Sequence, residues 1–193
     1  MKVKYSDLKN KRVFITGGGS GIGGSIVEHF CEQGSEVYFV DIDLKETKKL
    51  LNKIKKNKFR TPTFIECNLL DINKLEKTIK NIIAKKGPIH ALINNAANDD
   101  RHTTDQVDEK YWENRMAINL KHYFFAAKAV VKSMKKMKAG SIVNLSSVSW
   151  MLGEGDKVVY ETAKSAVVGL TRSFAQEYGC LLYTSPSPRD ETK

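Results

Sequence analysis

A tyrosine and a lysine four residues apart are the side chains in this sequence best suited to acid–base chemistry. Tyr160 and Lys164 lie in a stretch, 157–178, whose apolar spacing predicts a helix, where residues i and i+4 share one face. A phenol ordinarily ionises at about pH 10, and an adjacent ammonium favours the phenolate. With the hydroxyl of Ser147 upstream, the pair suggests proton transfer between an alcohol and a carbonyl. A solvated Tyr/Lys pair is the alternative, since such pairs are common on helix surfaces.

The pattern of the chain predicts an α/β protein. Short β-branched runs alternate with longer amphipathic stretches, which indicates βαβ units, right-handed crossovers and a doubly wound, Rossmann-like parallel sheet. We expect strands at 12–16, 36–41, 63–67, 90–94 and 141–146. We expect helices at 21–33, 44–56, 72–85, 108–138 (broken near its start) and 157–178.

A glycine-rich stretch joins the first predicted strand to the first predicted helix. It reads Thr16-Gly-Gly-Gly-Ser-Gly-Ile-Gly23. Glycines at this place let the backbone turn tightly and approach a pyrophosphate, which then lies on the N-terminus of the helix. We therefore assign cofactor contacts to Gly17, Ser20, Gly21, Ile22 and Gly23.

Asp41, at the end of the second predicted strand, is placed to accept hydrogen bonds from the adenine-side ribose of a dinucleotide. Its carboxylate would repel a 2′-phosphate, and Ser20 supplies no compensating cation. The sequence thus predicts NAD rather than NADP as cofactor. The alternative is that Asp41 caps the next helix, a role that Asp43 fills equally well.

Composition excludes several classes of protein. The 193 residues carry a formal net charge of +10, with ordinary hydrophobic and charged fractions of 41% and 28%. We expect no metal site, since Cys31 and Cys67 lack ligand spacing and resemble core thiols of a reducing compartment. We see no secretory signal or membrane span, and expect a cytoplasmic protein.

The excess of lysine raises the possibility of a nucleic-acid partner. Many of the lysines occupy 44–58, where Leu44, Leu51 and Ile54 can form an apolar stripe. This pattern is typical of a solvated helix whose lysine stems lie along the surface. No aromatic interleaving accompanies the lysines, so we expect no nucleic-acid partner.

The sequence changes character after Gly179. Residues 180–190, Cys-Leu-Leu-Tyr-Thr-Ser-Pro-Ser-Pro-Arg-Asp, carry two prolines and no periodicity. They resemble a translated sequencing adapter; a natural disordered tail is the alternative. We expect one incomplete catalytic domain, 1–179, followed by a non-native tail, 180–193.

Five motifs in order resemble the short-chain dehydrogenase/reductase family over 8–179. They are Thr16-Gly17-x-x-x-Gly21-x-Gly23, Asn94-Asn-Ala-Ala97, Asn119 within Ile-Asn-Leu, Ser147, and Tyr160-x-x-x-Lys164. Ala97 stands where the family usually has glycine, and Asn68 where many members have aspartate. Asn68 can still accept from the adenine amino group. The resemblance adds Asn68, Leu69, Asn95, Tyr160 and Lys164 to the cofactor-binding residues.

Longer strings resemble one branch of that family, the bacterial NAD-dependent dehydrogenases of D-xylose and related aldoses. They include Asn94-Asn-Ala-Ala-Asn-Asp-Asp-Arg-His102, Tyr111-Trp112, Ser147-Val-Ser-Trp150 and Tyr160-Glu-Thr-Ala-Lys164. The resemblance implies oxidation of an aldose at C1 by NAD to give the lactone.

The resemblance also implies catalytic roles. Tyr160 is then the general base, Lys164 acidifies it and holds the nicotinamide ribose, Ser147 binds the reacting oxygen, and Asn119 steadies a water. Ser147 and Tyr160 are the expected substrate-binding residues. Alternatively, Ser147 caps a strand end and Asn119 is a buried amide that pairs with backbone. The loop 98–102 either contacts the sugar or is solvated.

Other readings remain open. A reductase of 3-oxoacyl or keto compounds would share every catalytic residue, and a non-catalytic nucleotide-binding or nucleic-acid-binding protein is a further alternative. Family members often form tetramers through the helices here predicted at 108–138 and 157–178, so a homo-oligomer is implied. They also carry two further strands, a helix and a substrate loop after the point reached at Gly179. We therefore expect the chain as written to be unstable or inactive.

Overall fold

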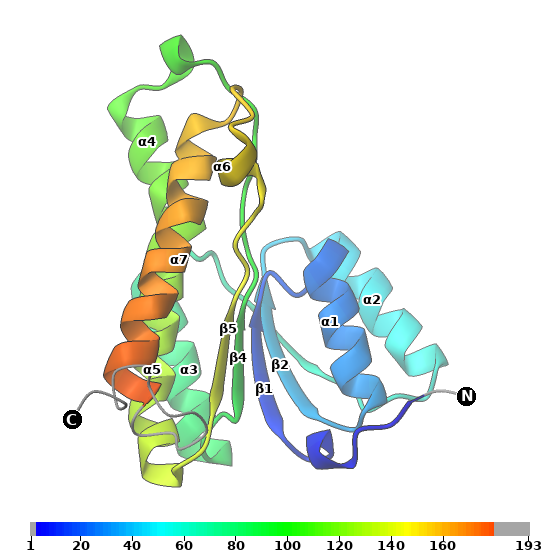
Figure 1. Ribbon diagram of the computed structural model, residues 1–193. Coiled ribbons are helices and arrows are strands. Elements are labelled where there is room, and N and C mark those ends of the chain that lie inside the picture. The colour runs from blue at the N-terminus through cyan, green and yellow to red at the C-terminus, as the bar shows by residue number, and fades with distance from the viewer. Residues whose placement is uncertain (1–2, 180–193) are drawn as a thin grey trace, which may run out of the picture.

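The computed structural model describes residues 3–179 and contains a five-stranded parallel sheet (Figure 1). Its order is β3-β2-β1-β4-β5. The strands are β1 (Arg12–Thr16), β2 (Glu36–Asp41), β3 (Thr63–Glu66), β4 (Ala91–Asn94) and β5 (Ser141–Asn144). The α/β doubly wound fold predicted from the sequence is confirmed. The predicted tail 180–193 lies outside the described residues.

Helices cover both faces of the sheet (Figure 1). The set comprises α1 (Gly21–Glu32), α2 (Leu44–Lys56), α3 (Ile72–Lys86), α4 (Glu109–Met116), α5 (His122–Met137), α6 (Ser149–Leu152) and α7 (Val158–Tyr178). Short 3-10 turns occur at η1 (Ser6–Leu8) and η2 (Thr104–Gln106), and η3 (Ala117–Lys121) is π-helical. None of the helices in residues 3–179 has the length and apolar content that crossing a bilayer requires.

Alternating side chains of β1 build two separate cores. Val13 and Ile15 pack with Val27 of α1 and Ile54 of α2. Phe14, between them in sequence, joins the cluster formed with α3, α5 and α7 on the other face. Because neighbouring residues of a strand point to opposite faces, one continuous apolar run serves both layers.

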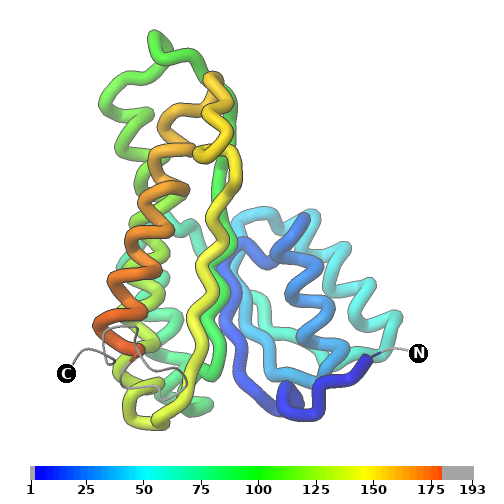
Figure 2. The backbone as a smooth tube through the Cα atoms, viewed as in Figure 1, coloured from blue at the N-terminus to red at the C-terminus, as the bar shows by residue number. Residues whose placement is uncertain are grey.

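The strands end in register at one edge of the sheet. Thr16 pairs with Val40 on one side and with Asn94 on the other, and Asn94 pairs with Asn144. The chain order reverses between β1 and β4, which in open α/β sheets is where ligands bind. Figure 2 shows the chain leaving β4 and β5 at this shared edge.

Aspartates begin three of the helices. Asp43, Asp71 and Asp108 each accept a hydrogen bond from the backbone N–H three residues later, which satisfies a free donor of the first turn. Asp43 therefore caps α2, and the alternative that Asp41 does so is wrong.

The helix predicted over 108–138, with a break near its start, is instead continuous and contains a π-helical segment. The chain passes from α4 through the π-helical segment η3 into α5, and η3 buries Asn119 completely. A π-bulge inserted into a helix is often found at functional sites.

Two details differ from expectation. The predicted ends of strands and helices differ from the observed ones by up to two residues, and α6 was not predicted. Leu44 does not contribute to an apolar stripe, since it is 53% exposed, whereas Ile54 is fully buried. Leu44 follows the capping Asp43 directly and is the first residue of α2.

Gly23 is required by close packing of α1 against the glycine loop. A Cβ at this position would lie 1.9 Å from the Gly17 carbonyl oxygen, whereas one at the adjacent Gly24 would meet nothing closer than 3.6 Å. Gly23→Ala should therefore lower the free energy of unfolding by about 1–3 kcal/mol. Gly24→Ala, the matched control in the same helical turn, should be neutral or slightly stabilising. Urea denaturation followed by circular dichroism measures both; equal effects would contradict the packing argument.

Candidate active site

Tyr160 and Lys164 lie in the first two turns of α7, and their side chains are neighbours. The Nζ of Lys164 is 5.7 Å from the centre of the Tyr160 ring. Tyr160 is half-buried, and Lys164 is only 1% exposed. The i,i+4 spacing thus places a phenol beside an amine at the interior, as predicted, and the solvated-pair alternative is wrong for this lysine.

The amine of Lys164 is held by oxygen atoms. It donates hydrogen bonds of 2.8 Å to the Oη of Tyr123 and of 2.8 Å to the carbonyl oxygen of Leu145. Burial lowers the pKa of Lys164 from 10.5 to about 8, because an interior position disfavours the charged form. The amine is consequently close to its titration midpoint in the mildly alkaline range.

Tyr123, on α5, is a site residue that the sequence analysis missed. It is fully buried, and its hydroxyl lies 3.0 Å from the Leu145 carbonyl oxygen as a donor. Burial raises its pKa above the ordinary value. Tyr123 belongs to no motif. In the sequence it stands among apolar residues of a predicted helix, so nothing there indicated that its hydroxyl makes a polar contact.

Asn119 pairs with the backbone of the loop after β4. Its Oδ1 accepts from the Asn98 N–H at 2.8 Å, and its Nδ2 donates to the Asn98 carbonyl oxygen at 2.9 Å. The reading of Asn119 as a buried amide that pairs with backbone is therefore correct. It fixes this loop to η3, directly before α5.

Ser147 lies on the loop that leaves β5 and is half-buried. Its hydroxyl is 2.8 Å from the hydroxyl of Ser149 and accepts a hydrogen bond from the Ser149 N–H at 3.2 Å. The pairing with Ser149 N–H gives Ser147 a local structural role between β5 and α6. Its contact with a reacting oxygen stays a prediction.

His102 ties the loop 98–102 to the start of α7. Its Nε2 accepts from the Val159 N–H at 3.4 Å, so the ring proton belongs on Nδ1, which lies 2.8 Å from the Oη of Tyr111. Its backbone N–H donates to the Asp156 carbonyl oxygen at 2.7 Å. His102 is 5% exposed. It is therefore not a solvated loop residue, and its ring is too buried for a sugar to reach it freely. Sequence gave no sign of this contact because the partners are more than 50 residues apart.

Ion pairs hold the rest of that loop. Asp100 pairs with Arg115 of α4 at 2.6 Å, and Arg101 pairs with Asp156 just before α7. The loop therefore joins α4 to α7 across the site.

The glycine loop and Asp41 form a second part of the site. The Oδ2 of Asp41 accepts from the Gly19 N–H at 2.7 Å, and its Oδ1 accepts from the N–H groups of Ile42 and Asp43 at 2.7 and 2.9 Å. Three backbone donors thus place a carboxylate directly beside the loop. A contact of this carboxylate with a cofactor ribose stays a prediction.

The backbone here fits a dinucleotide phosphate. Gly17 has φ +65°, and a Cβ on it would lie 2.8 Å from the Cα of Ala96. Gly21 has φ +53° with open space around its Cα, and Ile22 is 68% exposed. The N-terminus of α1, with its unpaired backbone donors, therefore faces open space where an anion can approach.

The other predicted cofactor residues take different places. The Nδ2 of Asn95 donates to the Gly17 carbonyl oxygen at 2.9 Å, which connects β4 to the glycine loop. The Oδ1 of Asn68 accepts from the Leu70 N–H at 3.0 Å, and the Leu69 side chain is buried in the core. Ser20 precedes α1 as its N-terminal flanking residue.

Two expectations about metals and cysteines can be compared with the structure. Within residues 3–179, no group of three or more His, Cys, Asp or Glu side chains is arranged to hold a metal ion. Cys31 and Cys67 are free and buried, as predicted. Burial raises the pKa of the Cys31 thiol to about 12, which makes it a poor nucleophile.

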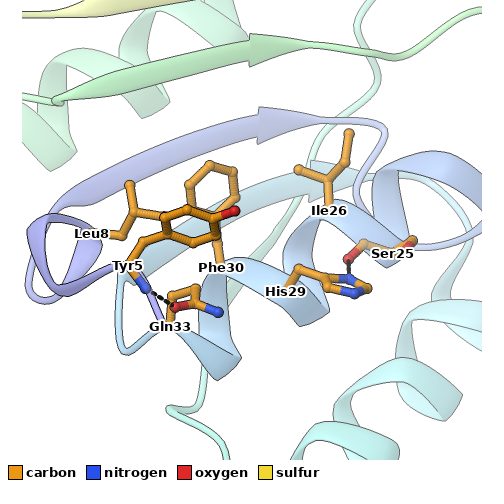
Figure 3. Close-up of a pocket in the computed structure, with 7 residues that line it drawn as sticks. All are labelled: Tyr5, Leu8, Ser25, Ile26, His29, Phe30 and Gln33. Atoms are coloured by element: carbon orange, nitrogen blue, oxygen red, sulfur yellow. Dashed lines mark hydrogen bonds between the residues drawn. The ribbon is translucent and has the colours of Figure 1, made fainter. Parts of the chain in front are cut away.

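A pocket elsewhere in the molecule contains none of the predicted site residues. It lies between the N-terminal segment and the outer side of α1 (Figure 3) and has a volume of about 280 Å³. Gln33 secures that segment, since its Oε1 accepts from the Tyr5 N–H at 2.8 Å and its Nε2 donates to the Val3 carbonyl oxygen. The lining residues are Tyr5, Leu8, Ser25, Ile26, His29, Phe30 and Gln33.

Comparison with known proteins identifies the family. The sequence model described as short chain dehydrogenase matches residues 11–180. The chain therefore belongs to the short-chain dehydrogenase family and is an oxidoreductase. Members of the family generally use NAD or NADP.

Individual relatives include two dehydrogenases of sugars. The chain is 42% identical to D-xylose 1-dehydrogenase of Caulobacter vibrioides over 175 residues, which cover 91% of this chain and 68% of the relative. It is 38% identical to the probable galactose dehydrogenase GalD of Rhizobium meliloti, over 91% of this chain and 69% of the relative. The structure of Thermoplasma acidophilum aldohexose dehydrogenase superposes with a TM-score of 0.80 at 32% identity, covering 92% of this chain and 65% of that one. The chain thus spans about two thirds of the length of these relatives.

The lowered pKa of Lys164 makes the stability of the fold depend on pH. Between about pH 8 and 10.5 the folded chain holds fewer protons at this amine than the unfolded chain. Stability rises with pH wherever the unfolded state binds more protons. The unfolding free energy should therefore increase across this window, relative to Lys164→Met, and level off above it. Urea denaturation of both proteins at pH 7 and pH 10 measures the difference between their unfolding free energies. If that difference does not depend on pH, the amine is not desolvated.

Proposed function

We propose that this protein oxidises the C1 hydroxyl of an aldopyranose such as D-xylose, with NAD as hydride acceptor, to give the aldonolactone. The observation that carries the proposal is the buried Lys164 amine 5.7 Å from the Tyr160 ring. The sugar is suggested by the 42% identity to D-xylose 1-dehydrogenase and the 38% identity to the probable galactose dehydrogenase GalD.

Tyr160 acts as the proton acceptor. As carbon C1 loses its hydride, the proton of the C1 hydroxyl passes to the phenolate oxygen of Tyr160, and the reverse reaction returns it. The Lys164 ammonium stabilises that phenolate by its positive charge. The half-buried position of Tyr160 leaves its ring accessible to a substrate on one side. NAD, when bound, supplies the chemistry of hydride transfer.

Ser147 orients the substrate. Its hydroxyl donates to the reacting C1 oxygen, where charge develops in the transition state. In the structure the same hydroxyl is 2.8 Å from that of Ser149. Ser149 can accept or donate there, so it holds Ser147 in place while the substrate contact forms.

Asn119 has a supporting role. Both polar ends of its side chain are occupied by the backbone of Asn98, so the side chain holds the loop after β4 in place. The backbone of the π-helical segment departs from the regular α-helical hydrogen-bonding pattern. We assign to this position the water that passes the proton toward Lys164.

The chain binds NAD rather than NADP in this proposal. The Asp41 carboxylate then accepts hydrogen bonds from the adenine-side ribose hydroxyls, and its charge opposes a 2′-phosphate. Gly17, Ser20, Gly21, Ile22 and Gly23 bind the pyrophosphate through backbone and the α1 N-terminus. Asn68, Leu69 and Asn95 flank the adenine and ribose, and Lys164 contacts the nicotinamide ribose.

The protein is further proposed to act in the cytoplasm as a homo-oligomer. Trp112 on α4 and Phe124 on α5 are 39% and 42% exposed. The resemblance to the family carries the proposal of an oligomer, and these two exposed side chains lie on helices α4 and α5, within the segment through which family members often associate.

A second candidate is reduction of a 3-oxoacyl substrate. The chain is 32% identical to 3-oxoacyl-[acyl-carrier-protein] reductase of Buchnera aphidicola over 88% of its length. That identity is lower than to the sugar dehydrogenases, although Ser147, Tyr160 and Lys164 would serve either reaction.

Substrate assays separate the two candidates. The test protein is a chimaera that joins residues 1–179 to the C-terminal part of the Caulobacter enzyme, assayed beside the 193-residue chain. We expect NADH formation from D-xylose or a related aldose, with NAD preferred to NADP, and no oxidation of NADH by acetoacetyl substrates. Activity with ketones and none with any aldose would overturn the sugar proposal.

Asp41→Ala in the chimaera is the control for cofactor choice. It removes the carboxylate and leaves the catalytic residues intact, so the preference for NAD should weaken by about tenfold or more, equivalent to about 1.4 kcal/mol. A parent protein that already prefers NADP would contradict the role of Asp41.

A further inference from the structure

Two phenols flank the amine of Lys164. Its Nζ is 5.7 Å from the ring centre of Tyr160, on its own helix, and 5.0 Å from that of Tyr123, on α5. Of these two phenols it is Tyr123 that accepts a hydrogen bond from the amine, Nζ to Oη at 2.8 Å. The catalytic role proposed above uses Tyr160, and Tyr123 has no part in it so far.

The Lys164 amine, the Tyr123 hydroxyl and the Leu145 carbonyl oxygen are all hydrogen-bonded to one another. The carbonyl oxygen of Leu145, at the end of β5, accepts from both Lys164 and Tyr123. The Tyr123 hydroxyl therefore gives its proton to Leu145 and accepts from the ammonium. The carbonyl of Ala96, after β4, lies 3.4 Å from the same hydroxyl. Tyr123 thus joins the ends of β4 and β5 to the lysine of α7.

The hydrogen-bond acceptors of the Lys164 amine are uncharged oxygen atoms. Within the described residues, burial accounts for its lowered pKa and no carboxylate contributes to it. The titratable groups facing it are Tyr160 on α7 and Tyr123 and His122 on α5. Burial and the Lys164 charge lower the pKa of His122 to about 3, so its ring is neutral. Without the Tyr123 hydroxyl, the amine would keep one hydrogen-bond acceptor, the Leu145 carbonyl.

Tyr123 is suited to hold the amine rather than to exchange protons. Its side chain is fully buried, and burial together with the nearby Tyr160 raises its pKa above the ordinary value. A phenol that stays neutral keeps its lone pair available to the ammonium over the working pH range.

We propose that Tyr123 is a positioning residue that anchors the Lys164 ammonium in the interior and keeps its charge facing Tyr160. This rests on the proposed role of Lys164 in the reaction. The hydroxyl of Tyr123 stabilises the charged form of the amine, because a hydrogen bond to the charged form favours it. Loss of that hydroxyl therefore disfavours the ammonium.

The test measures the titration of Lys164 directly in the 193-residue chain, without cofactor or substrate. Lysines are labelled with ¹³C at Cε, and the Lys164 signal is identified by its loss in Lys164→Arg. In Tyr123→Phe the pKa of Lys164 should fall by about half a unit or more. The matched control is Tyr178→Phe. Tyr178 lies on α7, the helix that carries Lys164, and packs on Phe174 away from the site. In Tyr178→Phe the pKa of Lys164 should not change. An unchanged titration in Tyr123→Phe would overturn the proposal.

A second measurement does not depend on the variant folding. In the unmodified chain, the Lys164 ε-CH₂ protons should show a nuclear Overhauser effect to the Tyr123 ring protons. Absence of that effect in a spectrum that resolves both signals would mean that the amine does not lie on Tyr123, and the anchoring role would be wrong.

Turnover then distinguishes this proposal from the proposed function. In the chimaera, Tyr123→Phe should move the alkaline limb of the kcat profile to lower pH by the same shift and leave the KM for the sugar within about twofold. A shifted Lys164 titration in the 193-residue chain, together with a chimaera that oxidises no aldose, would sustain the anchor and reject the sugar reaction. An unshifted titration with normal aldose oxidation would reject the anchor alone.

Discussion

A positive charge buried without a carboxylate partner is the constraint on which the site depends. Burying a charged group is costly unless it is hydrogen-bonded, and Lys164 is 1% exposed. Hydrogen bonds to two oxygen dipoles, the Leu145 carbonyl and the Tyr123 hydroxyl, offset that cost. A carboxylate would neutralise the field of the ammonium, whereas dipoles leave it directed at Tyr160. The same desolvation lowers the pKa of the amine to about 8.

The scaffold supplies these partners from segments distant in sequence. Parallel strands that end in register bring the Leu145 carbonyl and the loop after β4 to one edge. The π-helical segment buries Asn119, which holds that loop through Asn98. His102 connects the loop to the first turn of α7, so the helix that carries Tyr160 and Lys164 is fixed at its start. On the other side of β1, Asp41 is held beside the glycine loop by three backbone donors.

Local signals in the sequence predicted most of the fold. β1, β2 and α2 have the predicted bounds, because their patterns are strong and glycine or aspartate stands at their ends. The i,i+4 pair, the glycine loop and Asp41 are local motifs and could be found in the same way. The contacts of Tyr123 and His102 could not, since they are tertiary and no local pattern in either segment indicates the partner. The partner of Tyr123 lies 41 residues away, and only the packed helices bring the two together. Leu44 was misplaced because a periodic pattern does not show which first-turn residue faces the sheet.

The central claim is that the Tyr160 phenolate takes the substrate proton beside the buried ammonium. The most direct measurement compares Tyr160→Phe with the parent chimaera in single-turnover oxidation of the sugar, with NAD binding followed separately by fluorescence. The account predicts that the rate of oxidation falls by at least about 100-fold while the affinity for NAD stays within about twofold. A rate equal to that of the parent, with NAD bound, would contradict it.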